Sequence, residues 1–336
     1  MKTLNFRHSI HPFFAISILV LLASLLFTSC NDDDDDDMVM QPTPENIVGV
    51  LDQITESPES YMTDDTKSAR LKATKPKFKH LRQALVKTKL VSTVASTELT
   101  VFAPTDEAFN MLFEQLGIDG IDDLTAEQLT PILLYHVVGG KVSSGKLSNG
   151  YVETVNGSAI RVDLTDGVMI NDAQVTIADL HAANGIIHII DKVLLPPSMN
   201  LVETALSYDP EFSILVQAVV KADLQETLET GGPFTVFAPT NDAFVALLGE
   251  LGLPDLDAIP TETLVEVLKY HVVAGRVYSS DLVSGEVSSL NGTFSVNTST
   301  LTITDAQTRE ANLIPSLLNV QATNGVIHVI DKVLLP

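Results

Sequence analysis

The chain has 336 residues with 43 acidic and 20 basic side chains, which gives a formal net charge of −23 at pH 7. So negative a chain is poorly suited to nucleic acid or to anionic surfaces, and it favours neutral or cationic ligands. A single cysteine excludes an internal disulfide, while the length suits two ordinary domains that each bury a core of their own.

Residues 1–29 are predicted to be a secretory signal peptide. Lys2 and Arg7 provide a positive start, and an almost wholly apolar run follows from Phe13 to Phe27. Extended to Thr28, this run has 16 residues, fewer than the ~20 that a helix needs to cross a bilayer. A cleaved signal is therefore favoured over a transmembrane anchor.

The four residues before Cys30, Leu-Phe-Thr-Ser, resemble a bacterial lipobox, with Phe27 in place of the usual aliphatic residue. We predict that Cys30 is lipidated and becomes the new N-terminus, so that residues 30–45 form a lipidated acidic linker. Within this linker, the run from Asp32 to Asp37 cannot fold, because neighbouring like charges repel and nothing apolar offsets the cost of ordering.

The acidic run has two interpretations. It is a solvated spacer, or it acts like the export signal that it resembles, which sends lipoproteins to the outer face of the outer membrane in some Gram-negative groups. The expected location is thus the outer membrane, with exposure on the cell surface and the periplasmic face as the alternative.

A thirteen-residue stretch occurs twice, from Asn184 to Pro196 and from Asn324 to Pro336, and only two positions differ, each Ile against Val. A β-branched run opened by an Asn-Gly turn and closed by proline is typical of a strand. Because the stretch ends two similar segments, we predict two tandem domains over residues 46–196 and 199–336. The first carries about 20 extra polar residues around Glu56 to Lys75, which indicate a surface loop.

In chain order, each domain begins with helical patterns, of which one runs from Phe78 to Leu90. A short strand then leads through Ala-Pro into a threonine suited to cap a helix, Thr105 in the first domain and Thr240 in the second. Apolar stripes over residues 109–116 and 244–251 follow, and Gly117 and Gly252 stand where a left-handed helix end needs glycine.

The next helix in each domain ends at a Tyr-His pair. In the first domain, Thr125 and Gln128 form a potential capping box, although Pro131 also allows a later start with Thr130 as the cap. Beyond the helix lies β-structure with hairpin turns such as Asn156-Gly157. The second domain has seven extra residues after this region, expected in a loop around residues 309–316.

Together, Thr-Val-Phe-Ala-Pro-Thr, the Tyr-His pair and Asn-Gly-x-Ile-His-x-Ile-Asp-x-Val-Leu-Leu-Pro resemble the fasciclin domain, in the right order and twice. The resemblance implies an α+β fold, in which each domain is a β-wedge or sandwich packed with short helices. It also implies an extracellular or surface-attached module for adhesion or for binding proteins or glycans. In animal relatives the Tyr-His region has been linked to integrin binding, which maps onto Tyr135-His136 and Tyr270-His271.

These pairs are candidate binding or structural residues. His136 and His271 lie on apolar helix faces near the C-terminal ends, where an imidazole can hydrogen-bond terminal carbonyls and a positive form suits the helix dipole, so a structural role is favoured. His188 and His328 precede Asp191 and Asp331 by three residues, a spacing that puts His and Asp on opposite faces of a strand rather than in a dyad.

The sequence has no nucleophile elbow, no zinc-protease helix, no phosphate loop and no cysteine placed for catalysis, and we expect no catalytic residue, metal or cofactor. The first hypothesis is a surface-anchored, non-catalytic adhesion module that binds extracellular protein or glycan. The alternatives are an envelope enzyme acting on polysaccharide, and a structural envelope protein whose repeats associate with each other. Contact with the membrane is expected only through the lipid at Cys30.

Overall fold

The computed structural model describes residues 45–56 and 75–336. The signal segment, Cys30, the acidic run and nearly all of the extra polar segment of the first domain lie outside the described residues. Within them, no helix is both long enough and apolar enough to cross a membrane. We refer to the two halves of the described chain as domain 1, up to Pro196, and domain 2, from Met199.

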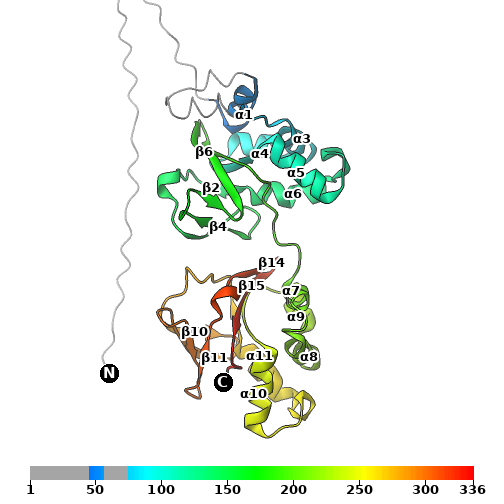
Figure 1. Ribbon diagram of the computed structural model, residues 1–336, viewed down its shortest axis with the longest axis vertical. Helices are drawn as coiled ribbons and strands as arrows, with labels where there is room; N and C mark the ends of the chain where they lie inside the picture. The colour runs from blue at the N-terminus through cyan, green and yellow to red at the C-terminus, as the bar shows by residue number, and fades with distance from the viewer. Residues whose placement is uncertain (1–44, 57–74) are drawn as a thin grey trace, which may run out of the picture. The chain divides into compact units, whose positions relative to one another are not determined.

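Domain 1 begins with helices and continues with strands, and Figure 1 shows the helices gathered on one side of the strands. Its helices are α1 (Ile47–Glu56), α3 (Lys79–Lys87), α4 (Val91–Ser96), α5 (Asp106–Leu116) and α6 (Ala126–Tyr135), with 3-10 turns η2 (Ile121–Asp123) and η3 (Ser144–Lys146). Its strands are β1 (Leu99–Pro104), β2 (Val137–Gly139), β3 (Gly150–Glu153), β4 (Ala159–Asp163), β5 (Met169–Ile170), β6 (Ala173–Ala182) and β7 (Gly185–Ile190).

These strands form one sheet in the order β2-β1-β7-β6-β5-β4-β3. Strands β1 and β7 pair in parallel, and the other pairs are antiparallel. Every residue of β1 and β7 is buried, because helices cover one face of this central pair and the outer strands fold over the other. The repeated stretch predicted as a strand is therefore the centre of the sheet.

Domain 2 follows the same order of elements. Its helices are α7 (Leu201–Ser207), α8 (Ser213–Lys221), α9 (Gln225–Thr230), α10 (Asn241–Leu251) and α11 (Thr261–Tyr270), with 3-10 turns η4 (Leu256–Ala258) and η5 (Pro315–Leu317). Its strands are β8 (Phe234–Pro239), β9 (Val272–Ala274), β10 (Gly285–Ser289), β11 (Gly292–Asn297), β12 (Thr302–Thr304), β13 (Glu310–Asn312), β14 (Val320–Ala322) and β15 (Gly325–Ile330).

In domain 2 the strands form two four-stranded sheets, β10-β11-β12-β13 and β14-β15-β8-β9. The ten-residue β6 of domain 1 is here replaced by β13 and β14, with η5 between them. Ala311 stands opposite Ile303, as Ala173 stands opposite Ile170, so most of the seven extra residues lie in the turn between β12 and β13, largely before the predicted loop around residues 309–316. The region predicted as a loop is partly strand, because it contains β13.

The predicted helix ends agree with the structure in detail. The side chains of Thr105 and Thr240 accept hydrogen bonds from the third residue beyond each cap, and Gly117 and Gly252 have positive φ angles of 66° and 65°. Thr125 and Gln128 form the full capping box, so the alternative start at Thr130 is wrong and Pro131 lies inside α6. Leu116 and Leu251 end the predicted apolar stripes but are about half exposed, because each lies in the last turn beside the glycine.

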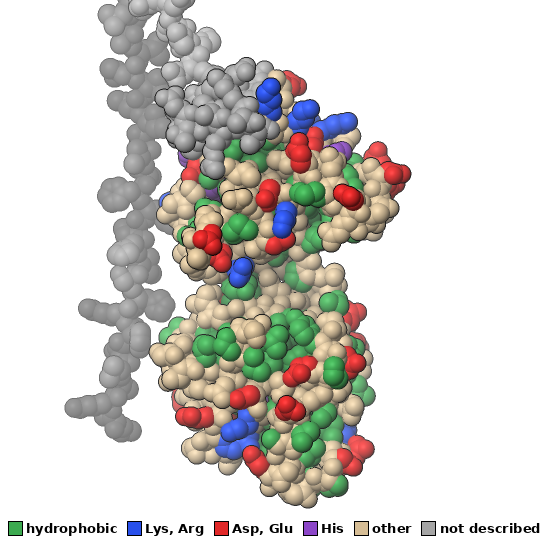
Figure 2. Space-filling model, viewed as in Figure 1, with side chains coloured by type: hydrophobic (Ala, Val, Ile, Leu, Met, Phe, Trp, Pro, Cys, Tyr) green, Lys and Arg blue, Asp and Glu red, His purple; other side chains and the backbone are tan. Residues whose placement is uncertain are grey.

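The α+β fold with two sheet-and-helix domains is therefore confirmed. Figure 2 shows acidic side chains spread over the visible face of both domains, with fewer basic ones. On this face the negative charge is therefore spread out rather than gathered in one patch.

Candidate functional site

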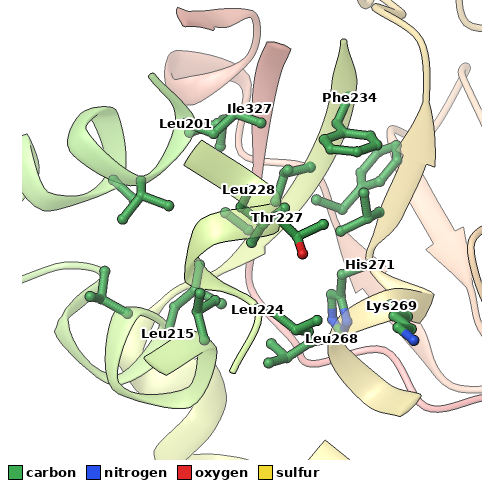
Figure 3. Close-up of a pocket in the computed structure, with 18 of the residues that line it drawn as sticks. Leu201, Leu215, Leu224, Thr227, Leu228, Phe234, Leu268, Lys269, His271 and Ile327 are labelled. Atoms are coloured by element: carbon green, nitrogen blue, oxygen red, sulfur yellow. The ribbon is translucent and has the colours of Figure 1, made fainter. Parts of the chain in front are cut away.

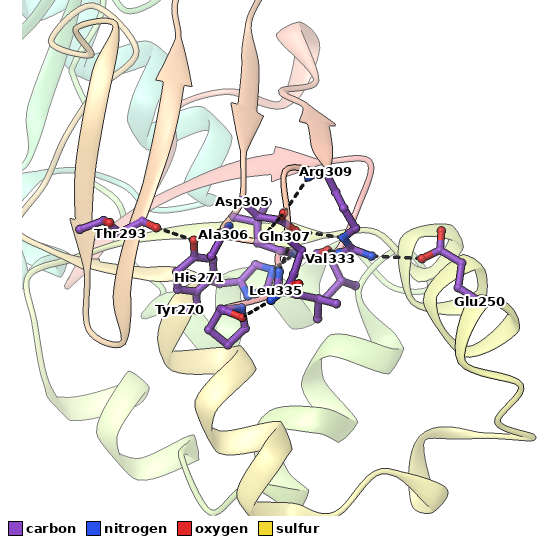
Figure 4. A network of polar contacts seen from close by, with 12 residues as sticks. Glu250, Tyr270, His271, Thr293, Asp305, Ala306, Gln307, Arg309, Val333 and Leu335 are labelled. Atoms are coloured by element: carbon purple, nitrogen blue, oxygen red, sulfur yellow. Dashed lines mark hydrogen bonds and ion pairs between the residues drawn. The ribbon is translucent and has the colours of Figure 1, made fainter.

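Both tyrosines of the Tyr-His pairs are 1% exposed. The Tyr135 hydroxyl donates to the carbonyl of Ala159 at 2.8 Å and accepts from the Asn171 side-chain amide at 3.1 Å. In Figure 4 the hydroxyl of Tyr270 likewise donates to Thr293 O at 2.6 Å, and it accepts from Ala306 N at 3.1 Å. Burial raises the pKa of Tyr135 above its usual value.

The two histidines of these pairs are 2% exposed and use both ring nitrogens. In His136, Nδ1 lies 2.8 Å from the carbonyl of Ile132, one turn earlier in α6, and Nε2 accepts from Leu194 N at 2.9 Å. His271 repeats this arrangement with Val267 O at 2.7 Å and Leu334 N at 2.9 Å. Each ring thus ties the end of a helix to the segment after the last strand of its domain.

These hydrogen bonds determine the protonation state. A backbone N–H can only donate, so Nε2 accepts and Nδ1 carries the proton that goes to the helix carbonyl. Burial lowers the pKa of both His136 and His271 to about 4. The expected bond to a terminal carbonyl is present, but the expectation of a positive ring is wrong, because the charged form would lose both its solvation and its bond to Leu194 or Leu334.

The histidines of the repeated stretch also lie inside the domains. The Nε2 atoms of His188 and His328 lie 3.0 Å and 2.8 Å from the carbonyls of Val142 and Val277. The carboxylate of Asp191 instead accepts from Gln174 N at 2.7 Å. Histidine and aspartate therefore serve different neighbours, as the strand spacing predicts.

A structural role that the sequence did not indicate belongs to Asn184 and Asn324. The side-chain oxygen of Asn324 accepts from Leu201 N at 2.9 Å, and its amide donates to the carbonyls of Leu228 and Gly231, both at 2.8 Å. Asn184 makes the same kind of bridge in domain 1, from the start of α1 to the end of α4. The Asn-Gly signal suggested only a turn.

The glycines after these asparagines, Gly185 and Gly325, are required because there is no space for a side chain, and not because of a positive φ angle. Each is the first residue of a central strand. A Cβ on Gly185 would lie 2.1 Å from Leu99 O, and one on Gly325 would lie 2.4 Å from Phe234 O. At each glycine the backbones of the two central strands and the first helix of the domain are in close contact, which leaves no room for a Cβ atom.

Among the described residues, the one buried carboxylate network lies in domain 2 and is drawn in Figure 4. Asp305 is 5% exposed and accepts from Arg309 Nε at 3.0 Å and from Leu335 N at 3.0 Å. Arg309 also donates to the carbonyl of Val333 and forms an ion pair with Glu250 at 3.1 Å. The network fixes the segment after β15 against the turn between β12 and β13.

Each domain also has an apolar cavity beneath its third helix. The α9 cavity of domain 2 has a volume of about 80 Å³, and Figure 3 shows Leu215, Leu228, Phe234 and Leu268 lining it. The α4 cavity of domain 1 measures about 140 Å³. Among the described residues, no group of three or more His, Cys, Asp or Glu side chains is arranged to hold a metal ion.

The fasciclin domain model matches residues 76–196 and 210–336, which is well over half of the chain. The chain belongs to the fasciclin domain family. Proteins of this family are non-catalytic adhesion or binding proteins, so the chain is classed with them rather than with enzymes.

Three relatives illustrate the family's range. "Protein sll1483" of Synechocystis is 43% identical over 44% of this chain and 79% of its own length. "Transforming growth factor-beta-induced protein ig-h3" of Sus scrofa is 32% identical over 70% of this chain, which spans only about a third (34%) of that relative. "Cell surface glycolipoprotein MPB83" of Mycobacterium bovis is 37% identical over 32% of this chain and 49% of its own length.

Among solved structures, a fasciclin domain pair from the insect cell adhesion molecule Fasciclin I aligns with 76% of this chain and 97% of its own. Its sequence identity is 22% and its TM-score is 0.36.

Proposed function

We propose that this protein is a surface-anchored, non-catalytic binding module that recognises an extracellular protein or glycan. The observation that carries the proposal is the presence of two fasciclin domains in one chain. A relative whose name denotes a cell-surface glycolipoprotein supports a location at the cell surface. The proposed anchor is lipid attached to Cys30, at the outer membrane and facing the exterior.

The Tyr-His pairs act in this proposal as structural residues. Their hydroxyls and ring nitrogens are engaged with the backbone inside each domain, and the side chains are 1–2% exposed. A partner that bound them directly would have to displace these hydrogen bonds. Recognition is therefore assigned to exposed residues, and the domain that binds is to be found by experiment.

An array of glycans and matrix proteins tests the proposal, probed with the mature chain from residue 30 carrying Cys30→Ala. We expect a specific signal that survives physiological salt. A blank array together with self-association in analytical ultracentrifugation would instead favour a homophilic envelope protein. Release of reducing sugar from a glycan panel would contradict the non-catalytic assignment.

The anchor has its own test. In the native host, the full-length protein is expected in the outer-membrane fraction, and external protease should digest it on intact cells. Cys30→Ala should remove it from that fraction. Retention of the variant in the membrane would point to an uncleaved signal anchor, and protection from external protease would place the protein on the periplasmic side.

A further inference from the structure

The α4 and α9 cavities are one site present twice. Leu133, His136 and Val137 line the first, and the residues 135 positions later, Leu268, His271 and Val272, line the second. Thr93 and Thr227 occupy matching positions on α4 and α9. The two domains therefore have a cavity at the same place although their side chains there differ. Protein interiors are normally close-packed, so a cavity that occurs in both domains is notable.

The α9 cavity is suited to an apolar occupant. Its walls are almost wholly aliphatic and aromatic, as Figure 3 shows, and both ring nitrogens of His271 are already bonded to backbone atoms. A buried water needs two to four polar partners, which this lining does not offer. An alkyl chain needs none and gains by leaving water.

The α9 cavity is also open to solvent. None of the residues of α9 is buried, whereas α4 in domain 1 buries Val94. Val236, on the central strand β8, is only partly buried, although its counterpart Val101 is 5% exposed. Leu290 at the rim is 47% exposed, so an apolar side chain already stands in water where a ligand would enter.

The rim of the α9 cavity carries one cation, Lys269 on α11. Its side chain is exposed and forms no ion pair with any residue of the described ranges. By contrast, Lys221 and Arg309 are held by backbone carbonyls and carboxylates. In the α4 cavity the matching residue is Leu134, so among the described lining residues only those of domain 2 offer an ammonium group at the entrance.

We propose that the α9 cavity binds the last few carbons of the alkyl chain of a free medium-chain fatty acid, whose remaining methylenes lie at the open side of the cavity and whose carboxylate pairs with the ammonium group of Lys269 at the rim. The chain enters between α9 and α11 and lies against β8. The α4 cavity, with leucine at the equivalent rim position, accepts neutral apolar groups and does not select for a carboxylate. This site is independent of the protein or glycan recognition proposed above.

The test uses the mature chain from residue 30 with Cys30→Ala, so that no lipid of its own competes. Octanoate and octanol are titrated while the methyl signals of Thr227 and Leu228 are followed by NMR. Octanoate is expected to shift these signals and to bind about fivefold more tightly than octanol, the size of effect that an exposed ion pair gives. Octanoate that leaves both methyl groups unchanged would overturn the proposal.

Two variants separate the chain site from the headgroup site. Ala205→Leu introduces the residue that domain 1 has at the matching position, Leu51, and should weaken octanoate roughly tenfold by displacing about two buried methylenes. Lys269→Leu copies Leu134 and should remove the preference for octanoate over octanol while octanol binding stays unchanged. Unchanged octanoate affinity in Ala205→Leu would refute the alkyl-chain site. An unchanged preference for octanoate over octanol in Lys269→Leu would refute the carboxylate site.

A further arm distinguishes free fatty acid from membrane lipid. Vesicles of pure phosphatidylcholine are not expected to co-sediment the Cys30→Ala chain. Co-sedimentation that Ala205→Leu abolishes would mean that the cavity takes acyl chains from a bilayer, and it would overturn the assignment to free fatty acid.

Discussion

Domains 1 and 2 keep the same central pair of parallel strands but close the rest of the fold differently. In domain 1 the long strand β6 pairs with the central strand β7 on one side and with the outer strand β5 on the other, so all seven strands form one sheet. In domain 2 the same course is divided between β13 and β14, and the Asp305 network joins the C-terminal segment to the turn before β13. The buried His and Asn contacts are the same in both, and each Tyr hydroxyl donates to a strand carbonyl.

This difference separates what the fold needs from what it tolerates. The parallel strands, the neutral histidine and the asparagine bridge occur in both domains with nearly the same distances. A continuous sheet is found only in domain 1. In domain 2 an insertion divides the sheet, and the buried ion pair between Asp305 and Arg309 holds the inserted turn in place. Substitutions in the shared elements should therefore affect both domains alike, and substitutions at the turn should affect one.

The largest shared effect should appear on acidification. The pKa of His136 and of His271 is about 4 in the folded protein and about 6.5 in the unfolded chain. Between these values the unfolded chain binds more protons, so stability is full above pH 6.5, falls as the pH drops towards 4, and falls no further below that through these groups. Each ring accounts for roughly 3 kcal/mol.

Urea unfolding followed by circular dichroism from pH 7 to pH 4 measures this loss. In His136→Gln and in His271→Gln the pH dependence should be shallower by one proton, each in its own domain. An unchanged slope in either variant would contradict the neutral assignment of that ring.

Gly325→Ala and Gly185→Ala should each cost about 3 kcal/mol, at the upper end of what overpacking a core costs, because the new methyl group meets a backbone oxygen that cannot turn away. Thermal unfolding measures the loss. Gly249→Ala is the control, since a Cβ there has open space around it. A large effect in one domain only would break the proposed equivalence of the two strands.

Asp305→Ala should destabilise domain 2 by about 2 to 3 kcal/mol, because it leaves the Arg309 guanidinium and the Leu335 N–H without their acceptor. Asp172 is the matched control in domain 1, since its ion pair with Lys192 is largely exposed and such pairs contribute about 0 to 1 kcal/mol. Equal losses in Asp305→Ala and Asp172→Ala, measured by urea unfolding, would show that the network does not distinguish the domains.

Thr105→Ala and Thr240→Ala should give the smallest effect, about 1 kcal/mol each, through loss of the helix cap. Calorimetry on the two variants compares the domains at a site where the hydrogen-bond distances are 3.3 Å and 3.2 Å. Losses that differ by more than their experimental error would mean that the two helices are not held equally.

Local patterns in the sequence predicted most of the elements, because caps, glycine ends, hairpin turns and β-branched runs act over a few residues. They did not predict the Asn324 bridge, whose partners lie more than 90 residues away. The sequence patterns also align Asp172-Ala173 with Asp305-Ala306. The strand register shows that Ala311 is the true counterpart of Ala173, because Ala311 stands opposite Ile303 as Ala173 stands opposite Ile170. The network turn begins at Asp305, and only the fold reveals that it is an insertion.

The neutral state of His136 and His271 was missed for a similar reason. A histidine at a helix end predicts a favourable positive charge when it is exposed. The partner that decides the proton, Leu194 N or Leu334 N, is 58 or 63 residues away in the chain.

The central position of β7 has a mechanical consequence. The start of α1 is bonded through Ile47 N to Asn184, immediately before β7, and β7 is paired along its length with β1 on one side and β6 on the other. Tension applied through the two ends of domain 1 runs along β7, so its cross-strand hydrogen bonds are loaded together in shear instead of opening one after another. Single-molecule pulling should therefore show one high-force rupture for domain 1 rather than a series of small ones.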